Sequence, residues 1–291
     1  MARSARTPQL PKAAELLLGS HPGPAAVVTL VALLLCVVVG VPVMGVVLLT
    51  AAVLAGQLSI GWSNDWLDAA RDRAVARSDK PIVRGAISVA TVRAAAFLAA
   101  AVTVVLSVLL GPAAAVANLV CAGCGWAYNL GLKNSPFSAV PYALCFGLLP
   151  AVATLTRHPA AFPSWWVIAS GAMLGVAAHL TNALPDLASD AATGIRGMPH
   201  RLGADVCGYL AFALLGGVAG LIAAGMLAVP RPATNAVVFA IGGATVGIAL
   251  AAIGLVLTAR HVHSRVLMRL VMVGAVIDVV MLLGAGRALL A

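Results

Sequence analysis

Acidic side chains are scarce in this chain, and three of them lie close together. The sequence has 9 Asp and Glu among 291 residues, and Asp65, Asp68 and Asp72 directly follow a long apolar run. Carboxylates at helical spacing repel one another. Such a cluster is therefore expected where a cation lies between the carboxylates. We predict that these three residues bind cations.

A second acidic cluster has the same spacing as the first. The pattern Asn-x3-Asp-x3-Asp occurs at 64–72 and again at 182–190, with an offset of 118 residues. Steps of four keep side chains on one helix face, although Pro185 predicts a kink or a new helix start in the second copy. Solvated loop acids in ordinary surface pairs are the alternative interpretation, but solvation does not require matched spacing. The residues are Asn64, Asp68 and Asp72, then Asn182, Asp186 and Asp190.

The elements that position these residues are predicted to be membrane-spanning helices. The chain is 62% hydrophobic and 9% charged, with a mean hydropathy of +1.05, whereas soluble domains carry about 25% charged residues. In hydrocarbon the backbone polar groups of a span must be paired internally, so the spans are helices. About nine apolar runs approach the roughly 20 residues that a crossing needs. They cover roughly 25–43, 45–64, 88–110, 113–130, 138–156, 164–184, 207–229, 234–257 and 266–289.

The predicted fold is thus an all-α integral membrane bundle with one domain at 23–291, preceded by a basic N-terminal cytoplasmic or interfacial segment at 1–22. With the N-terminus in the cytoplasm, all but three of the 18 Lys and Arg fall on the cytoplasmic side. The exceptions are Arg157, Arg231 and Arg287. This asymmetry accounts for the net charge of +9 without a nucleic-acid partner.

Both acidic clusters then share the cytoplasmic side, because four crossings separate them, and the repeat is parallel. The abundance of Arg and Ala indicates a high-GC bacterial genome. We therefore expect a multi-pass protein of the bacterial cytoplasmic membrane, in contact with membrane lipids.

Ligands that are all oxygen atoms favour a hard cation such as Mg²⁺, which binds one or two carboxylates together with substrate phosphates. Two such ions would clamp a diphosphate and make it a leaving group. Nearby basic residues could take the remaining phosphate oxygens. Because the site lies in a membrane protein, we also expect the substrate to carry a lipid tail. The basic residues concerned are Arg71, Arg73, Lys80, Arg84, Arg196 and Arg201.

Four motifs resemble those of the UbiA-type membrane prenyltransferase superfamily. The segment 64–72 is similar to its NDxxDxxxD motif, and 80–85 to the (R/K)PxxxG that follows. The DxxxD at 186–190 resembles the second acidic motif, and Tyr128 with Lys133 resembles the Tyr…Lys pair. The resemblance covers essentially the whole chain, since family members have nine helices with both acidic motifs cytoplasmic.

The resemblance implies Mg²⁺-dependent transfer of an isoprenyl or polyprenyl group from its diphosphate to an acceptor, often an aromatic ring. It assigns two metal ions to Asp65, Asp68, Asp72, Asp186 and Asp190. The resulting carbocation could be stabilised by aromatic faces, for which Tyr128, Trp62, Trp66 and Trp126 are candidates beside the alternative of interfacial anchoring. The expected substrate-binding residues are Asn64, Lys80, Arg84, Tyr128, Lys133, His179, Asn182, Arg196 and Arg201.

Three alternatives stay open at the level of the sequence. A membrane carrier could use the aspartate clusters to bind a cation, although transport sites are expected near the midplane. His179 could bind the acceptor or remove a proton, or it could make a helix–helix hydrogen bond. Asp278, in the last span, could pair with Arg287 or face the cavity.

Overall fold

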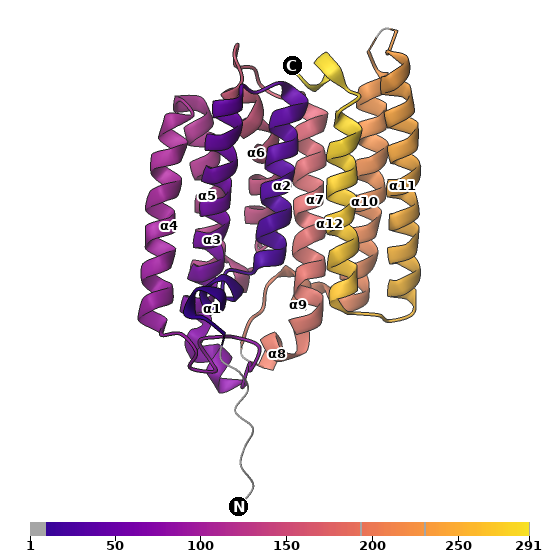
Figure 1. Cartoon of the computed structure of the whole chain (residues 1–291). Coiled ribbons are helices and arrows are strands. Elements are labelled where there is room, and N and C mark those ends of the chain that lie inside the picture. Colours follow the sequence, from indigo (N-terminus) through magenta and orange to yellow (C-terminus); the bar gives the residue numbers. More distant parts are fainter. Residues whose placement is uncertain (1–9, 193, 230, 291) are drawn as a thin grey trace, which may run out of the picture.

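The chain forms a bundle of long helices that run side by side (Figure 1). The structure is a computed structural model that describes residues 10–192, 194–229 and 231–290. Within these ranges the regular elements are helical, which confirms the predicted all-α fold. The long helices are α2 (Pro22–Val39), α3 (Val43–Ala74), α4 (Val89–Leu109), α5 (Pro112–Leu130), α6 (Val140–Thr156), α7 (Trp165–Ala183), α10 (Ala204–Leu227), α11 (Thr234–Ala259) and α12 (Arg265–Leu282).

Short helices connect the long ones and carry parts of the acidic motifs. They are α1 (Lys12–Leu18), η1 (Leu132–Asn134), η2 (Leu184–Asp186), α8 (Leu187–Ala192), α9 (Met198–Leu202) and η3 (Gly286–Leu289). Two basic residues of the predicted N-terminal segment, Arg3 and Arg6, lie outside the described residues, and so does the side chain of Arg287.

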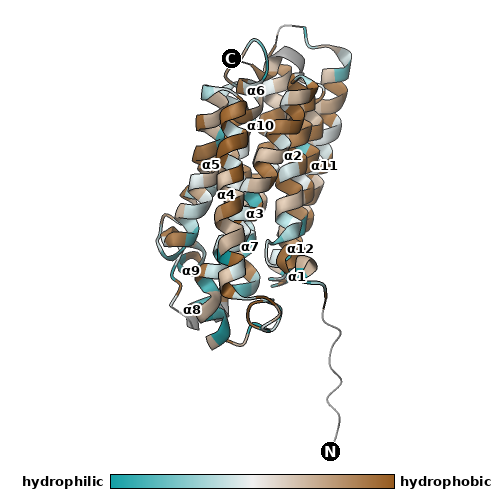
Figure 2. Ribbon diagram, turned by 60° about the vertical axis from the view of Figure 1, so that its left-hand side comes forward, coloured by the Kyte–Doolittle hydropathy of each residue, from teal (hydrophilic) through white to brown (hydrophobic). Residues whose placement is uncertain are grey.

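Seven of the described helices are long and apolar enough to cross a membrane. They are α2, α3, α4, α5, α7 extended through η2, α10 and α11. The two further predicted spans correspond to α6, which has 17 residues, and α12, which has 18 residues and three charged side chains. Figure 2 shows apolar residues along the helices and more hydrophilic ones toward the helix ends, including the end with α1, α8 and α9. The chain is a multi-pass membrane protein, and the crossing by α6 and α12 stays a prediction.

The last helix ends earlier than predicted. The apolar run suggested 266–289, but α12 stops at Leu282 and the chain continues through a turn into η3. The backbone N–H of Ser164 donates to the carbonyl of Leu289 at 2.8 Å, which ties this segment to the start of α7. The apolar character of the final residues therefore serves packing against the bundle, which hydropathy does not distinguish from a longer helix.

The two acidic motifs lie at the same end of the bundle but are built differently (Figure 1). Helix α3 runs without interruption through 64–72, so its motif side chains share one face as predicted. In the second motif α7 gives way to η2 and α8 around Pro185. Proline has no backbone N–H and cannot continue the helical hydrogen-bond ladder, which confirms the predicted interruption.

Helix α1 packs against the motif end of α3. The indole of Trp62 donates a hydrogen bond to the carbonyl of Leu16 at 2.8 Å, and Arg84 pairs with Glu15 at 2.6 Å. A Cβ at Gly61 would lie 2.2 Å from the carbonyl oxygen of Ser20. Glycine at this position therefore lets the segment after α1 lie directly on α3.

Helices α6 and α7 approach each other through glycines. A Cβ at Gly171 would lie 2.3 Å from the carbonyl oxygen of Phe146, and one at Gly175 would lie 2.3 Å from that of Tyr142. Small residues allow such close backbone approach between helices in lipid. The spacing of α6 and α7 matters because both helices line the central cavity.

We expect Gly175→Ala to destabilise the protein by about 1–3 kcal/mol, because the added methyl group collides with a backbone carbonyl that cannot move aside. The measurement is the thermal unfolding midpoint in detergent. Gly220→Ala in α10 is the matched control, since a Cβ there meets nothing within 4 Å and alanine favours the helix. Equal midpoints for the two variants would contradict the close packing of α6 on α7.

Candidate active site

A cavity of about 320 Å³ lies among α2, α3, α5, α6, α7 and α12, and it has two chemically distinct ends. At the motif end its walls carry both acidic and basic side chains. The polar residues there include His21, Asn64, Asp68, Arg71, Asp72, Arg77, Lys80, Asn129, Lys133, Asn182, Asp186, Asp190 and His200.

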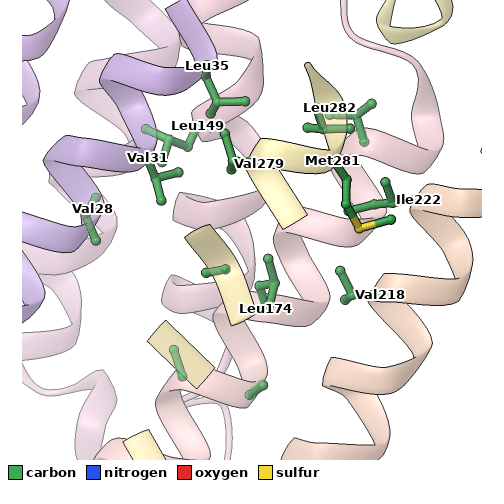
Figure 3. Packing of buried hydrophobic residues seen from close by; sticks show 14 of the residues in the cluster. Val28, Val31, Leu35, Leu149, Leu174, Val218, Ile222, Val279, Met281 and Leu282 are labelled. Carbon is green, nitrogen blue, oxygen red and sulfur yellow. The ribbon is translucent and has the colours of Figure 1, made fainter. Parts of the chain in front are cut away.

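Away from the motifs the cavity wall is largely hydrophobic. Val28, Val31 and Leu35 of α2 lie near Leu149 of α6 and Val279 of α12 (Figure 3). These residues belong to one buried apolar cluster that continues through α7 and α10. The cavity thus suits an amphiphilic molecule, with a charged group at the motif end and an apolar group between α2 and α12.

Asp68 of the first motif pairs with two basic side chains. It bonds Lys133, which follows α5 in η1, and Arg71 one turn further along α3 at 2.8 Å. Both Asp68 and Lys133 are buried. Burial lowers the pKa of Lys133, and the charge of Asp68 opposes that change. The family resemblance named Lys133, and the structure places it directly on the first motif.

Basic side chains near the first acidic motif interact with carboxylates of the second. Arg77, in the loop after α3, lies 3.5 Å from Asp186 of the second motif and 3.0 Å from Asp79. The hydrogen bond from Arg77 holds the pKa of Asp79 below its usual range. Burial raises the pKa of Asp190, which the charge of Arg71 opposes. The motifs, 118 residues apart in sequence, therefore act on each other electrostatically.

Asp65 differs from the other four motif aspartates, because it does not line the cavity in the described structure. Its carboxylate bonds Lys80 and lies 3.1 Å from His21, in the connection between α1 and α2. Lys80 itself lines the cavity. In this arrangement Asp65 fixes the position of Lys80 at the cavity wall.

Four predicted phosphate ligands lie away from the described cavity wall, and one of them is the exposed Arg73. Arg84 pairs with Glu15 of α1. Arg196 and Arg201 are exposed, and the guanidinium of Arg201 donates to the carbonyl of Arg196 at 3.3 Å. The cations that the structure brings to the cavity are instead Arg71, Arg77, Lys80 and Lys133.

A group of rings lines the cavity beside the polar end. Tyr128, Tyr142 and His179 have ring centroids 4.9–5.7 Å apart. His179 also shares a hydrogen bond of 3.0 Å with Ser138, and it precedes Asn182 by less than one turn of α7. We call Tyr128, Tyr142 and His179 the ring cluster.

The three tryptophans proposed beside Tyr128 do not line the described cavity. Trp62 donates to the carbonyl of Leu16, and Trp126 donates to Ser59 at 2.9 Å. Trp66 and Trp126 pack edge to face with centroids 6.5 Å apart. These side chains hold α1, α3 and α5 together, whereas Tyr128 faces the cavity.

Sequence reasoning missed three residues of the site, namely Arg77, Tyr142 and His21. Tyr142 carries no motif, and its only signal is a phenol within an apolar span, where hydrophilic groups are uncommon. His21 precedes the first span and contacts a motif aspartate 44 residues later. Contacts of this kind come from tertiary structure, and spacing along the chain does not predict them.

The donor set at the polar end fits Mg²⁺. Four aspartates line it with carboxylate oxygens, which are the hard ligands that this ion prefers. Asn64 and Asn182 add carbonyl oxygens or amide donors on the same wall. The four basic side chains on this wall could pair with an anion that binds together with the metal.

Comparison of the fold with solved structures identifies several similar proteins. A UbiA homologue from Archaeoglobus fulgidus bound to GPP and Mg²⁺ is 16% identical, with a TM-score of 0.71, and the match covers 93% of this chain and 99% of that one. The apo structure of a UbiA homologue from Aeropyrum pernix K1 is 15% identical, with a TM-score of 0.72 and coverage of 89% and 96%. A structure described for the biosynthesis of digeranylgeranylglyceryl phosphate synthase in membranes is 14% identical, with a TM-score of 0.66 and coverage of 95% and 99%.

The sequence itself carries the family signal. No curated protein matches the chain, but the model of the UbiA prenyltransferase family matches residues 25–277. This range includes both acidic motifs, the Tyr128–Lys133 segment, seven of the nine long helices in full and most of α2 and α12. The chain therefore belongs to the UbiA prenyltransferase family.

Proposed function

We propose that this protein transfers an isoprenyl or polyprenyl group from its diphosphate to an acceptor nucleophile and releases diphosphate, in a reaction that depends on Mg²⁺. The observation that carries the proposal is the amphiphilic cavity, which combines carboxylates and cations at one end with an apolar wall at the other. Solved homologues from Archaeoglobus fulgidus bound to GPP and to DMAPP, each with Mg²⁺, support it.

The metal would be held by the aspartates that line the cavity, namely Asp68, Asp72, Asp186 and Asp190. Asp65, the fifth aspartate of the predicted set, would act there through Lys80, which it bonds. Bound as the predicted pair of ions, Mg²⁺ would neutralise the diphosphate and make it a better leaving group. Asn64 and Asn182 would contact the diphosphate or the ligands of the metal.

The basic side chains on the cavity wall would bind the diphosphate oxygens. Arg71 and Arg77 present planar guanidinium groups that suit phosphate, and Lys80 and Lys133 add point charges. Their present partners are aspartates of the two motifs. The donor would therefore enter a site in which the cations are already positioned. The more distant Arg84, Arg196 and Arg201 would contribute to the positive potential at this end of the bundle.

The ring cluster would face the first carbons of the isoprenyl group. Departure of the diphosphate leaves an allylic cation, which aromatic faces stabilise electrostatically. The apolar wall beyond the rings keeps water from that cation. His179, within the ring cluster on the cavity wall, would contact the acceptor or take up its proton.

The acceptor would be an aromatic ring or another nucleophile of a lipid precursor. The excess of Lys and Arg in the loops of one side supports a cytoplasmic N-terminus, with both acidic motifs at the cytoplasmic face of a bacterial membrane. A soluble diphosphate product could then leave directly into the cytoplasm.

We expect Asp68→Asn to lower Mg²⁺-dependent diphosphate release by about 100-fold or more, because it removes a carboxylate that would hold the metal. The measurement is diphosphate release by the purified protein from prenyl diphosphates of several lengths, with phenolic acids, naphthoates, glycerophosphate or phosphoribosyl diphosphate as acceptors.

Asp205→Asn is the matched control, since Asp205 lies outside the described cavity wall and bonds His261 and His263. No release by folded wild-type protein with any of these pairs would contradict the transferase. It would favour a cation carrier, which flux measurements in liposomes can detect.

We expect Tyr128→Ala to lower the turnover number by about 10-fold, whereas Tyr128→Phe keeps most of it, because the ring face rather than the hydroxyl would stabilise the cation. Steady-state kinetics with the best acceptor provides the measurement. Equal losses in both variants would show that the phenol oxygen, and not the ring, is what the reaction needs.

A further inference from the structure

An acidic side chain lies deep in the bundle where the proposed chemistry does not use it. Asp278 of α12 is 1% exposed, and neither of its carboxylate oxygens has a hydrogen-bond partner among the described residues. It lines the cavity among apolar neighbours such as Ala275 and Val279. The structure thus shows the cavity-facing position that the sequence left open, whereas the side chain of Arg287 lies outside the described residues.

A second buried polar group without a partner lines the same cavity. Ser170 of α7 is 3% exposed, and its hydroxyl makes no hydrogen bond to any described residue. Unsatisfied buried polar groups are rare in native proteins, because desolvation without a partner is unfavourable. Two of them on one apolar cavity wall indicate that a ligand supplies the missing partner.

Ser170 and Asp278 lie at the same depth on neighbouring helices. Thr181 of α7 and Met268 of α12 touch at 3.3 Å, which aligns the two helices beside the second acidic motif. Ser170 lies eleven residues from Thr181, and Asp278 ten residues from Met268. At 1.5 Å per residue both lie about 15–17 Å from that level, toward the apolar end.

We propose that Asp278 and Ser170 form a polar subsite that binds a hydroxyl group of an otherwise apolar ligand, about 15 Å from the level of Thr181 and Met268. A hydroxyl donates to the carboxylate of Asp278 and can accept from Ser170, so one group satisfies both residues. An uninterrupted hydrocarbon chain satisfies neither of them.

In the reaction proposed above, either of two molecules could carry this hydroxyl. The identification of the ligand rests on that proposed function. It can belong to the far end of the isoprenoid donor or to the acceptor. In either case the subsite selects a substrate that is polar at both ends. The recognition chemistry is the same, and separate binding measurements distinguish the two sources.

The test measures ligand affinity in wild type and Asp278→Leu, in nanodiscs with Mg²⁺. The donor arm compares geranyl and farnesyl diphosphates with analogues that carry a hydroxyl on the terminal carbon. The acceptor arm compares alkylphenols with analogues that carry a hydroxyl on the terminal carbon of the alkyl chain. We expect the hydroxyl to improve the dissociation constant of wild type by about 10-fold in one arm, and we expect Asp278→Leu to lose this gain.

Ser170→Ala should lose part of the gain. Thr50→Val is its matched control, because Thr50 has a buried hydroxyl without a described partner but lies outside this cavity. A hydroxyl that improves binding in neither arm, or equally in Asp278→Leu, would overturn the proposal. Mg²⁺-dependent binding of geranyl diphosphate by wild type tests the transferase separately. The transferase function and the hydroxyl subsite can therefore be contradicted independently.

Thermal unfolding without ligand provides a second test. Because Asp278 has no partner among the described residues, Asp278→Leu should raise the melting temperature by about 2–4 °C. A purely structural role for the carboxylate predicts a lower melting temperature for this variant, and that result would also count against a ligand subsite.

Discussion

Repulsion between carboxylates is the constraint on which the motif end of this bundle depends. Acidic side chains of α3, η2 and α8 meet in a partly buried space, where charges interact more strongly than in water. Arg71, Arg77 and Lys133 lie between or beside them and compensate their charge. The extension of α3 beyond the apolar run and the placement of η1 after α5 both bring these cations to the acids.

The same compensation explains how one site can suit both a metal and an anion. Side chains that balance carboxylates are also suited to phosphate oxygens, since both are negatively charged acceptors. A metal ion and a diphosphate that arrive together change the net charge less than either would alone. On binding, the aspartates could then pair with the metal ion and the basic side chains with the diphosphate, so that no charge in the site is left unpaired.

Much of this arrangement could be predicted from the sequence because it follows local rules. Steps of four along α3 place Asn64, Asp68 and Asp72 on one face, and Pro185 interrupts the second motif, as the structure shows. Hydropathy predicted the all-helical fold. The resemblance named Lys133 as a substrate-binding residue, and the structure places it beside Asp68.

The remainder depends on contacts that no local pattern encodes. The bond between Asp65 and Lys80 and the position of His21 beside them follow from how α1 and α2 pack on α3. The early end of α12 follows from packing of the last residues against the start of α7. The depth shared by Ser170 and Asp278 is visible only when α7 and α12 are placed side by side.

The docking of α1 on α3 also has a consequence for biogenesis. Leu16 binds Trp62, which lies 46 residues later in the chain, and Glu15 binds Arg84, which lies 69 residues later. Although α1 is synthesised first, it cannot reach its final position until α3 and the following loop have emerged from the ribosome. The contacts of α1 at the motif end can therefore form only after α2, α3 and the loop that carries Arg84 are in place.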